Sequence, residues 1–141
     1  MATPTTLALD DPRRITRARD LLDRAEMLLV PASTDPADQF LGLYLAALRG
    51  AGAILALYER PSRIGSRSAW LRLPKVASDM DTWAAYFAGF SDLRADLDAG
   101  LRRSVPESVV TELRHQVNNF LDRVEAEIVR VEHGRTAARA A

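Results

Sequence analysis

Apolar side chains recur three and four positions apart along most of this chain, which is the spacing of one helix face. Asp11 is a good N-cap and Pro12 follows it at the first helical position, so a helix is predicted from there to about Val30. Its apolar positions are Ile15, Ala18, Leu22, Ala25 and Leu29. The segment 31–36 holds two prolines and breaks the pattern. Residues 1–9 lack periodicity, and we expect a disordered tail there.

The next segment, from Ala37 to Glu59, is apolar nearly all round. Such a helix is expected at the centre of a fold, where every side is covered. Glycines stand at positions 42, 50 and 52, and each costs about 1 kcal/mol relative to alanine inside a helix. Close packing of neighbouring helices has to offset that cost.

Shorter periodic segments follow, and no stretch alternates for long enough to predict a strand. In order, we expect a basic loop over 60–68, a short helix over 69–73, helices over 76–87 and 93–101, and a long helix over 107–133. Gly134 is a typical C-cap, so residues 134–141 are expected to be disordered. Short connections between amphipathic helices favour an all-α, up-and-down bundle of four to five helices, in one domain over residues 10–133.

Composition narrows the function classes. The chain has 141 residues without cysteine, which excludes disulfides, cysteine-ligated zinc and thiol catalysis. The 19 basic and 19 acidic side chains balance, which argues against broad attraction to nucleic acid or an anionic membrane. No signal peptide is recognisable, and no uninterrupted apolar run approaches the roughly 18 residues of a membrane span. A cytoplasmic protein without membrane contact is therefore expected.

The two histidines do not form an evident site. His115 and His133 both fall in the last predicted helix, and their separation of 18 residues places them about 27 Å apart. They cannot share a metal ion within one chain. A di-iron bundle needs a Glu-x-x-His pair on each of two helices, whereas Glu112 and His115 form the lone instance. We therefore expect no metal, no cofactor and no catalytic residue.

The most suggestive segment is basic. It contains Arg60, Arg63, Arg67, Arg72 and Lys75, with no acidic residue between the first and the last. Trp70 lies among these cations, and arginines beside an aromatic ring can grip phosphates and stack a base. The candidate binding residues are Arg63, Arg67, Trp70 and Arg72. The alternative is an ordinary solvated loop in which Trp70 turns into the core and arginine stems cover it.

Three segments carry a family resemblance: the run 40–57, the tetrapeptide Arg-Ser-Ala-Trp over 67–70, and the run 82–88. With them, residues 15–131 resemble the HEPN superfamily, in particular a small stand-alone branch found in actinobacteria. The resemblance implies an up-and-down bundle with two long central helices, a homodimer, and an ancestry among RNA- and nucleotide-binding proteins.

Many HEPN proteins are metal-independent RNases, in which an arginine and a histidine a few residues apart stabilise the phosphorane and move protons. This chain departs from that pattern. His115 would need an arginine at positions 108–110, which hold Ser, Val and Val, and His133 would need one at positions 126–128, which hold Ala, Glu and Ile.

The sequence therefore predicts a non-catalytic HEPN-like bundle that acts as an interaction or RNA/nucleotide-binding module. One alternative is an RNase with a degenerate site, in which His115 or His133 works with Arg114 or Arg130. Another is a bundle that only binds a protein partner.

Overall fold

The computed structural model describes residues 4–61 and 67–140. Its elements are α1 (Pro4–Asp10), α2 (Pro12–Leu28), α3 (Pro36–Tyr58), α4 (Ala69–Val76), the 3-10 turn η1 (Ser78–Met80), α5 (Asp81–Ala88), α6 (Ser91–Asp98) and α7 (Glu107–Ala140). Within these two described ranges no residue belongs to a strand. The predicted all-α class is therefore confirmed.

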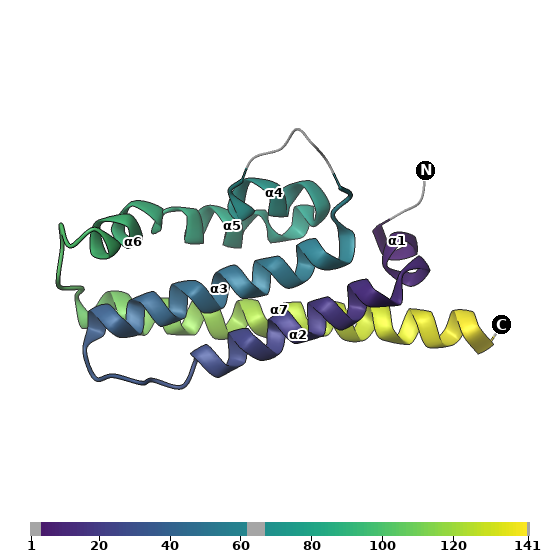
Figure 1. Cartoon of the computed structure of the whole chain (residues 1–141), viewed down its shortest axis with the longest axis horizontal. Coiled ribbons are helices and arrows are strands. Elements are labelled where there is room, and N and C mark those ends of the chain that lie inside the picture. The colour runs from purple at the N-terminus through teal and green to yellow at the C-terminus, as the bar shows by residue number, and fades with distance from the viewer. Residues whose placement is uncertain (1–3, 62–66, 141) are drawn as a thin grey trace.

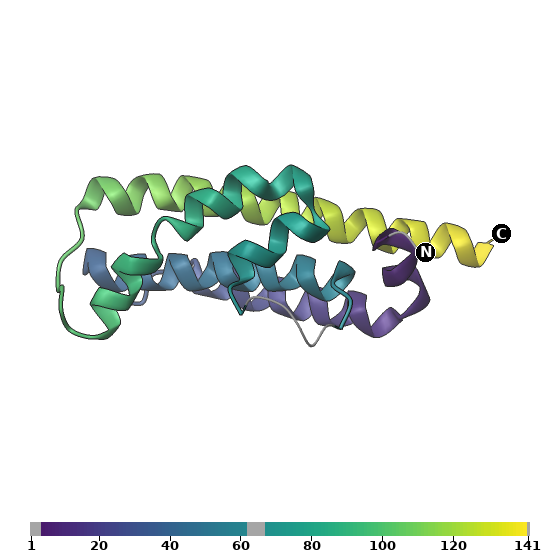
Figure 2. The same ribbon diagram turned by 90° about the horizontal axis from the view of Figure 1, so that it is seen from above.

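The helices form an elongated up-and-down bundle (Figure 1). Helices α2, α5 and α6 run in one direction along the long axis, and α3 and α7 run in the other, while α4 crosses between α3 and α5 (Figures 1 and 2). Seen from above, the row α4–α6 crosses over the long helices, and α1 sits at the end of the bundle near the C-terminal half of α7 (Figure 2). This is the arrangement that the sequence pattern predicted.

Helix α3 is the centre of the bundle because it is apolar on all sides. Pro36 occupies its first turn, and the Asp35 carboxylate accepts a hydrogen bond from the Ala37 backbone N–H at 3.1 Å. The helix packs against α1, α2, α4 and α7. By length and composition it could cross a membrane, but 61% of its most apolar window is buried inside the protein. That burial is typical of the core helix of a soluble domain.

The crossing of α3 and α7 depends on Gly50. A Cβ atom at this position would lie 2.6 Å from Leu121 Cδ2, closer than Cβ atoms approach other atoms in folded proteins, and 3.1 Å from Phe120 Cε2, so both side chains would have to shift. At Gly52 an added Cβ would meet only Leu21 Cδ1, at an ordinary 3.6 Å. Of these two glycines, Gly50 is therefore the one that the packing requires.

The two predicted disordered tails are wrong in the described part of the chain. Residues Pro4–Asp10 form α1, and α7 continues through Gly134 to Ala140. The two segments stabilise each other: Ala8 is fully buried, and Arg135 donates a hydrogen bond to the Leu9 carbonyl at 3.3 Å. Neither segment alone has enough apolar periodicity to predict a helix. The contacts that stabilise each helix come from the other segment, so they cannot be seen in the local pattern.

A buried carboxylate connects α1, α3 and α7. Glu127 is 6% exposed and accepts hydrogen bonds from the Tyr58 hydroxyl, from Arg123 at 3.0 Å and from Arg130 at 2.6 Å. Arg130 also donates to the Thr5 hydroxyl at 3.1 Å. Burial alone would raise the pKa of Glu127, but the hydrogen bonds from Arg130, Tyr58 and Arg123 outweigh it and lower that pKa to about 2.

The two α3 glycines give a matched stability test. We expect Gly50→Ala to lower the free energy of unfolding by about 1 kcal/mol or more, since overpacking outweighs the gain in helix propensity. Gly52→Ala should raise it by about 1 kcal/mol, because the new methyl group fits. Urea denaturation of both variants measures the difference, and equal effects at the two positions would contradict the close approach at Gly50.

The Glu127 network gives a pH test. Since its pKa is lower in the folded than in the unfolded chain, its contribution to stability is present above pH 4.5 and lost as pH falls toward about 2. Glu127→Gln should lower the free energy of unfolding at neutral pH by about 2 kcal/mol and flatten its pH dependence over that window. An unchanged slope in urea titrations between these pH values would show that the carboxylate is not held by its cationic partners.

Candidate functional site: a basic groove

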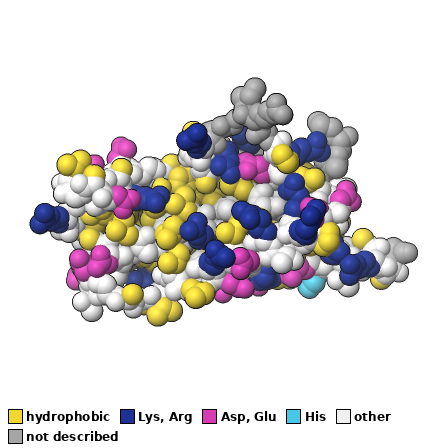
Figure 3. Space-filling view, viewed as in Figure 1, with side chains coloured by type: hydrophobic (Ala, Val, Ile, Leu, Met, Phe, Trp, Pro, Cys, Tyr) yellow, Lys and Arg dark blue, Asp and Glu magenta, His cyan; other side chains and the backbone are white. Residues whose placement is uncertain are grey.

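A groove of about 1130 Å³ lies between α2, α3 and α4, with α1 at one end. Among the residues that the structure describes, eight cationic side chains line it against two carboxylates, those of Asp11 and Glu59. The cations are Arg13, Arg14, Arg17, Arg49, Arg60, Arg67, Arg72 and Lys75. In the space-filling view, Lys and Arg side chains gather across the middle and right of this face, over α2, α3 and α4 (Figure 3). The groove is thus strongly cationic although the chain as a whole is neutral.

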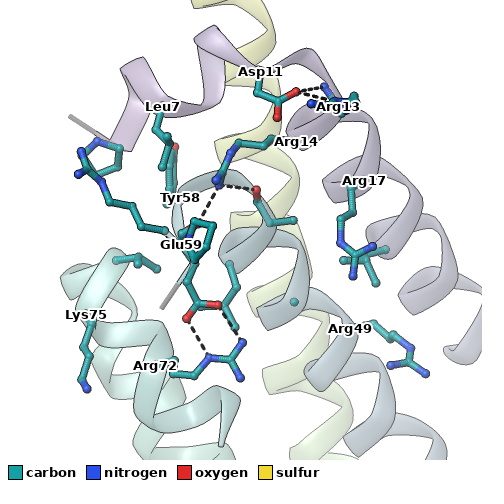
Figure 4. Close-up of a pocket in the computed structure, with 18 of the residues that line it drawn as sticks. Leu7, Asp11, Arg13, Arg14, Arg17, Arg49, Tyr58, Glu59, Arg72 and Lys75 are labelled. Carbon is teal, nitrogen blue, oxygen red and sulfur yellow. Dashed lines mark hydrogen bonds and ion pairs between the residues drawn. The ribbon is translucent and has the colours of Figure 1, made fainter. Parts of the chain in front are cut away.

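Helix α2 supplies the first wall. The Asp11 carboxylate caps it by accepting a hydrogen bond from the Arg13 backbone N–H at 3.0 Å. Arg14 reaches across to α3 and donates to the backbone carbonyls of Ala56 at 3.2 Å and Glu59 at 2.9 Å. It thereby satisfies carbonyls at the end of α3 and joins the start of α2 to that end (Figure 4).

Helix α3 supplies the floor. Leu48, Gly52 and Leu55 present apolar surface along the groove, and Leu21 of α2 borders it. Arg49 is exposed and lies with Arg17 on the same side of the groove (Figure 4). Across the described residues, neither of these two arginine side chains has a hydrogen-bond or ion-pair partner.

Helix α4 supplies the opposite wall, and an ion pair holds it to the end of α3. Arg72 donates from Nε to Glu59 Oε2 at 2.8 Å and from Nη2 to Oε1 at 3.0 Å. The side chains are 29% and 33% exposed. Lys75, one turn further along α4, is exposed and points away from this pair (Figure 4).

The structure brings together only part of the site predicted from sequence. Arg67 and Arg72 line the groove, whereas Arg63 lies outside the described residues. Trp70 was expected to offer a stacking surface, and this is wrong because it is only 4% exposed. Its ring packs among Tyr44, Phe87 and Phe120, and its indole N–H donates to the Tyr44 hydroxyl at 3.0 Å.

The sequence analysis did not identify the groove cations of α2 and α3, although their positions in the sequence are unusual. Arg13, Arg14 and Arg17 stand in the first turns of α2, where no acidic residue follows the cap. Positive charge is unfavourable at a helix N-terminus because the helix dipole is positive there. Arg49 is the one charged residue between Gln39 and Glu59 of a helix that is otherwise apolar.

The residues of the predicted RNase alternative lie elsewhere. His115 and His133 are exposed on α7 and do not line the groove. Arg114 donates to the Leu29 carbonyl at 3.3 Å, and Arg130 is held by Glu127. Among the residues that the structure describes, no group of three or more His, Asp or Glu side chains is placed to hold a metal ion.

The sequence matches the family model of the SAV_6107-like HEPN domain over residues 31–125. This match covers more than half of the chain, and its region includes α3 to α6 and the first half of α7. The chain belongs to this HEPN family, as the resemblance in its packing segments implied. No curated protein and no solved structure matched the chain.

Proposed function

We propose that this HEPN protein binds RNA through the basic groove and acts as a non-catalytic binding module. The observation that supports the proposal best is the set of cations without an internal partner. In the two described ranges, the side chains of Arg17, Arg49 and Lys75 form no hydrogen bond or ion pair. Unpaired cations that line one groove raise its positive potential, and an anionic ligand is attracted to that potential.

The lining favours contact with phosphates over recognition of bases. Aromatic platforms provide most of the stacking in proteins that bind single strands. The one aromatic residue that lines the groove is Tyr58, which is 5% exposed and engaged with Glu127. Burial raises the pKa of its hydroxyl, so it stays neutral. The proposed binding is therefore dominated by charge, depends steeply on salt and tolerates different base sequences.

The volume favours a strand over a single nucleotide. Pockets for small ligands usually enclose about 300 to 1,000 Å³. The groove exceeds that range at about 1130 Å³ and has cations on three helices. A polynucleotide can place successive phosphates on α2, α3 and α4, whereas a mononucleotide reaches one or two of these walls.

The test removes two groove cations that stabilise nothing else. Arg17→Ala combined with Arg49→Ala should weaken binding of single-stranded RNA roughly tenfold at low salt. The slope of log affinity against log salt should fall by about 1.4, because about 0.7 counterions are released per neutralised phosphate. Fluorescence anisotropy over a salt series measures both quantities.

The matched control is Arg103→Ala combined with Arg139→Ala. Both arginines are exposed, neither lines the groove, and the change in net charge is the same. If the control weakens binding as much as the groove variant does, the groove is not the binding site. Gel analysis of the RNA from each titration shows whether it stays intact, as a binding module requires.

We also propose that the protein works as a homodimer in the cytoplasm, as members of the superfamily often do. Light scattering coupled to size exclusion should give a mass near twice the 15.6 kDa of the chain. The ratio of absorbance at 260 and 280 nm on the same peak reports copurified nucleic acid. A mass near 15.6 kDa would contradict the proposed dimer. An absorbance ratio typical of protein alone would show that no nucleic acid copurifies.

A further inference from the structure

The carboxylate of Glu59 occupies the kind of position in the groove that a bound phosphate would take. Its two oxygens accept parallel hydrogen bonds from Arg72, at 2.8 and 3.0 Å. Arginine binds phosphate with the same two-point fork. Glu59 and Arg72 both line the groove, and each side chain remains about one-third exposed, so an incoming anion can reach the pair.

Both partners are held by contacts that do not need the ion pair. The Glu59 backbone N–H donates to the Leu55 carbonyl at 2.8 Å, and the Glu59 carbonyl accepts from Arg14 at 2.9 Å. Arg72 donates from Nη1 to the Arg67 carbonyl at 3.2 Å. The backbone of Glu59 and the guanidinium of Arg72 therefore keep their places when the carboxylate is removed or displaced.

We propose that Glu59 is an internal anion that competes with the ligand for Arg72 and so sets which anions the groove binds. This inference rests on the proposed RNA binding and adds how the groove discriminates between a strand and a small anion. A small anion has to displace the Glu59 carboxylate from Arg72 and makes few other contacts with the groove. A strand with several phosphates also reaches Arg17, Arg49 and Lys75, whose combined attraction offsets the exchange at Arg72.

Asp11 provides the contrast. It is the other acid that lines the groove, and its partner Arg13 contacts it at 3.2 Å. Their side chains are 36% and 91% exposed, so water screens the pair, and Arg13 is not held away from a ligand. Asp11→Asn keeps the helix cap, because asparagine caps as well as aspartate does, and removes the same charge as Glu59→Gln.

The experiment is a double-mutant cycle with a labelled single-stranded RNA of about 12 nucleotides, a length within the span of known single-strand sites. Glu59→Gln should tighten binding about fivefold, which corresponds to releasing one ion pair whose side chains are about one-third exposed. In the Arg72→Ala background, the same change should give no gain beyond the roughly twofold effect expected of Asp11→Asn.

A second probe tests the selectivity. The inhibition constant of inorganic pyrophosphate, corrected for the RNA affinity of each variant, should fall more in Glu59→Gln than the RNA dissociation constant does, because the strand can use its other contacts when Arg72 is paired and the small anion cannot. Thermal unfolding followed by circular dichroism confirms that each variant keeps its helices.

The outcomes separate the two proposals. RNA binding by the wild type with no gain in Glu59→Gln overturns this inference alone. A gain that persists without Arg72, or an equal gain from Asp11→Asn, also overturns it, because removal of any negative charge then suffices. Absence of RNA binding in every variant overturns the proposed function and this inference together.

Discussion

The bundle depends on one constraint, which is that α3 is apolar over most of its circumference and has to bury most of its surface. Helices α2 and α7 pack along it, and α4 closes the remaining side near its C-terminal end. Gly50 lets α7 approach closely, while the buried Trp70 anchors α4 to the aromatic core. The positions of α1, α2, α4 and α7 follow from this need, because each of them packs against the same central helix, whereas α5 packs on α4.

The groove is built from the same contacts that close the bundle. Helix α3 ends between the start of α2 and the body of α4, so its final carbonyls need donors. Arg14 supplies them from α2, and Arg72 pairs with Glu59 from α4. These two arginines are structural, and they bring the neighbouring cations, including Arg17, to one surface. Stability and charge placement are therefore coupled at this end of α3, where Arg14 and Arg72 are paired within the described part of the protein and Arg17 and Arg49 are not.

Periodicity was sufficient to predict the class, the central helix and the topology, because these follow from local apolar spacing. It failed at α1 and at the end of α7, where each segment is stabilised by the other at a distance of over a hundred residues. The candidate site was predicted in part for a similar reason. Arg67 and Arg72 are close in sequence and could be recognised as a basic segment, whereas Arg17 and Arg49 join them only through the packing of α2 and α3. Trp70 was misassigned because position among cations does not reveal whether a ring faces solvent or the core.

The concentration of cations on one face has a consequence for the whole molecule. The formal charges sum to zero, so an excess of positive charge around the groove requires an equal excess of negative charge over the rest of the chain. The charge of the protein is therefore divided unevenly between the groove and the remaining residues. For the RNA ligand proposed above, such a distribution favours encounters in which the groove faces the polyanion. Long-range orientation of this kind accelerates productive association at low ionic strength, and it does so without the indiscriminate attraction that a highly basic protein shows.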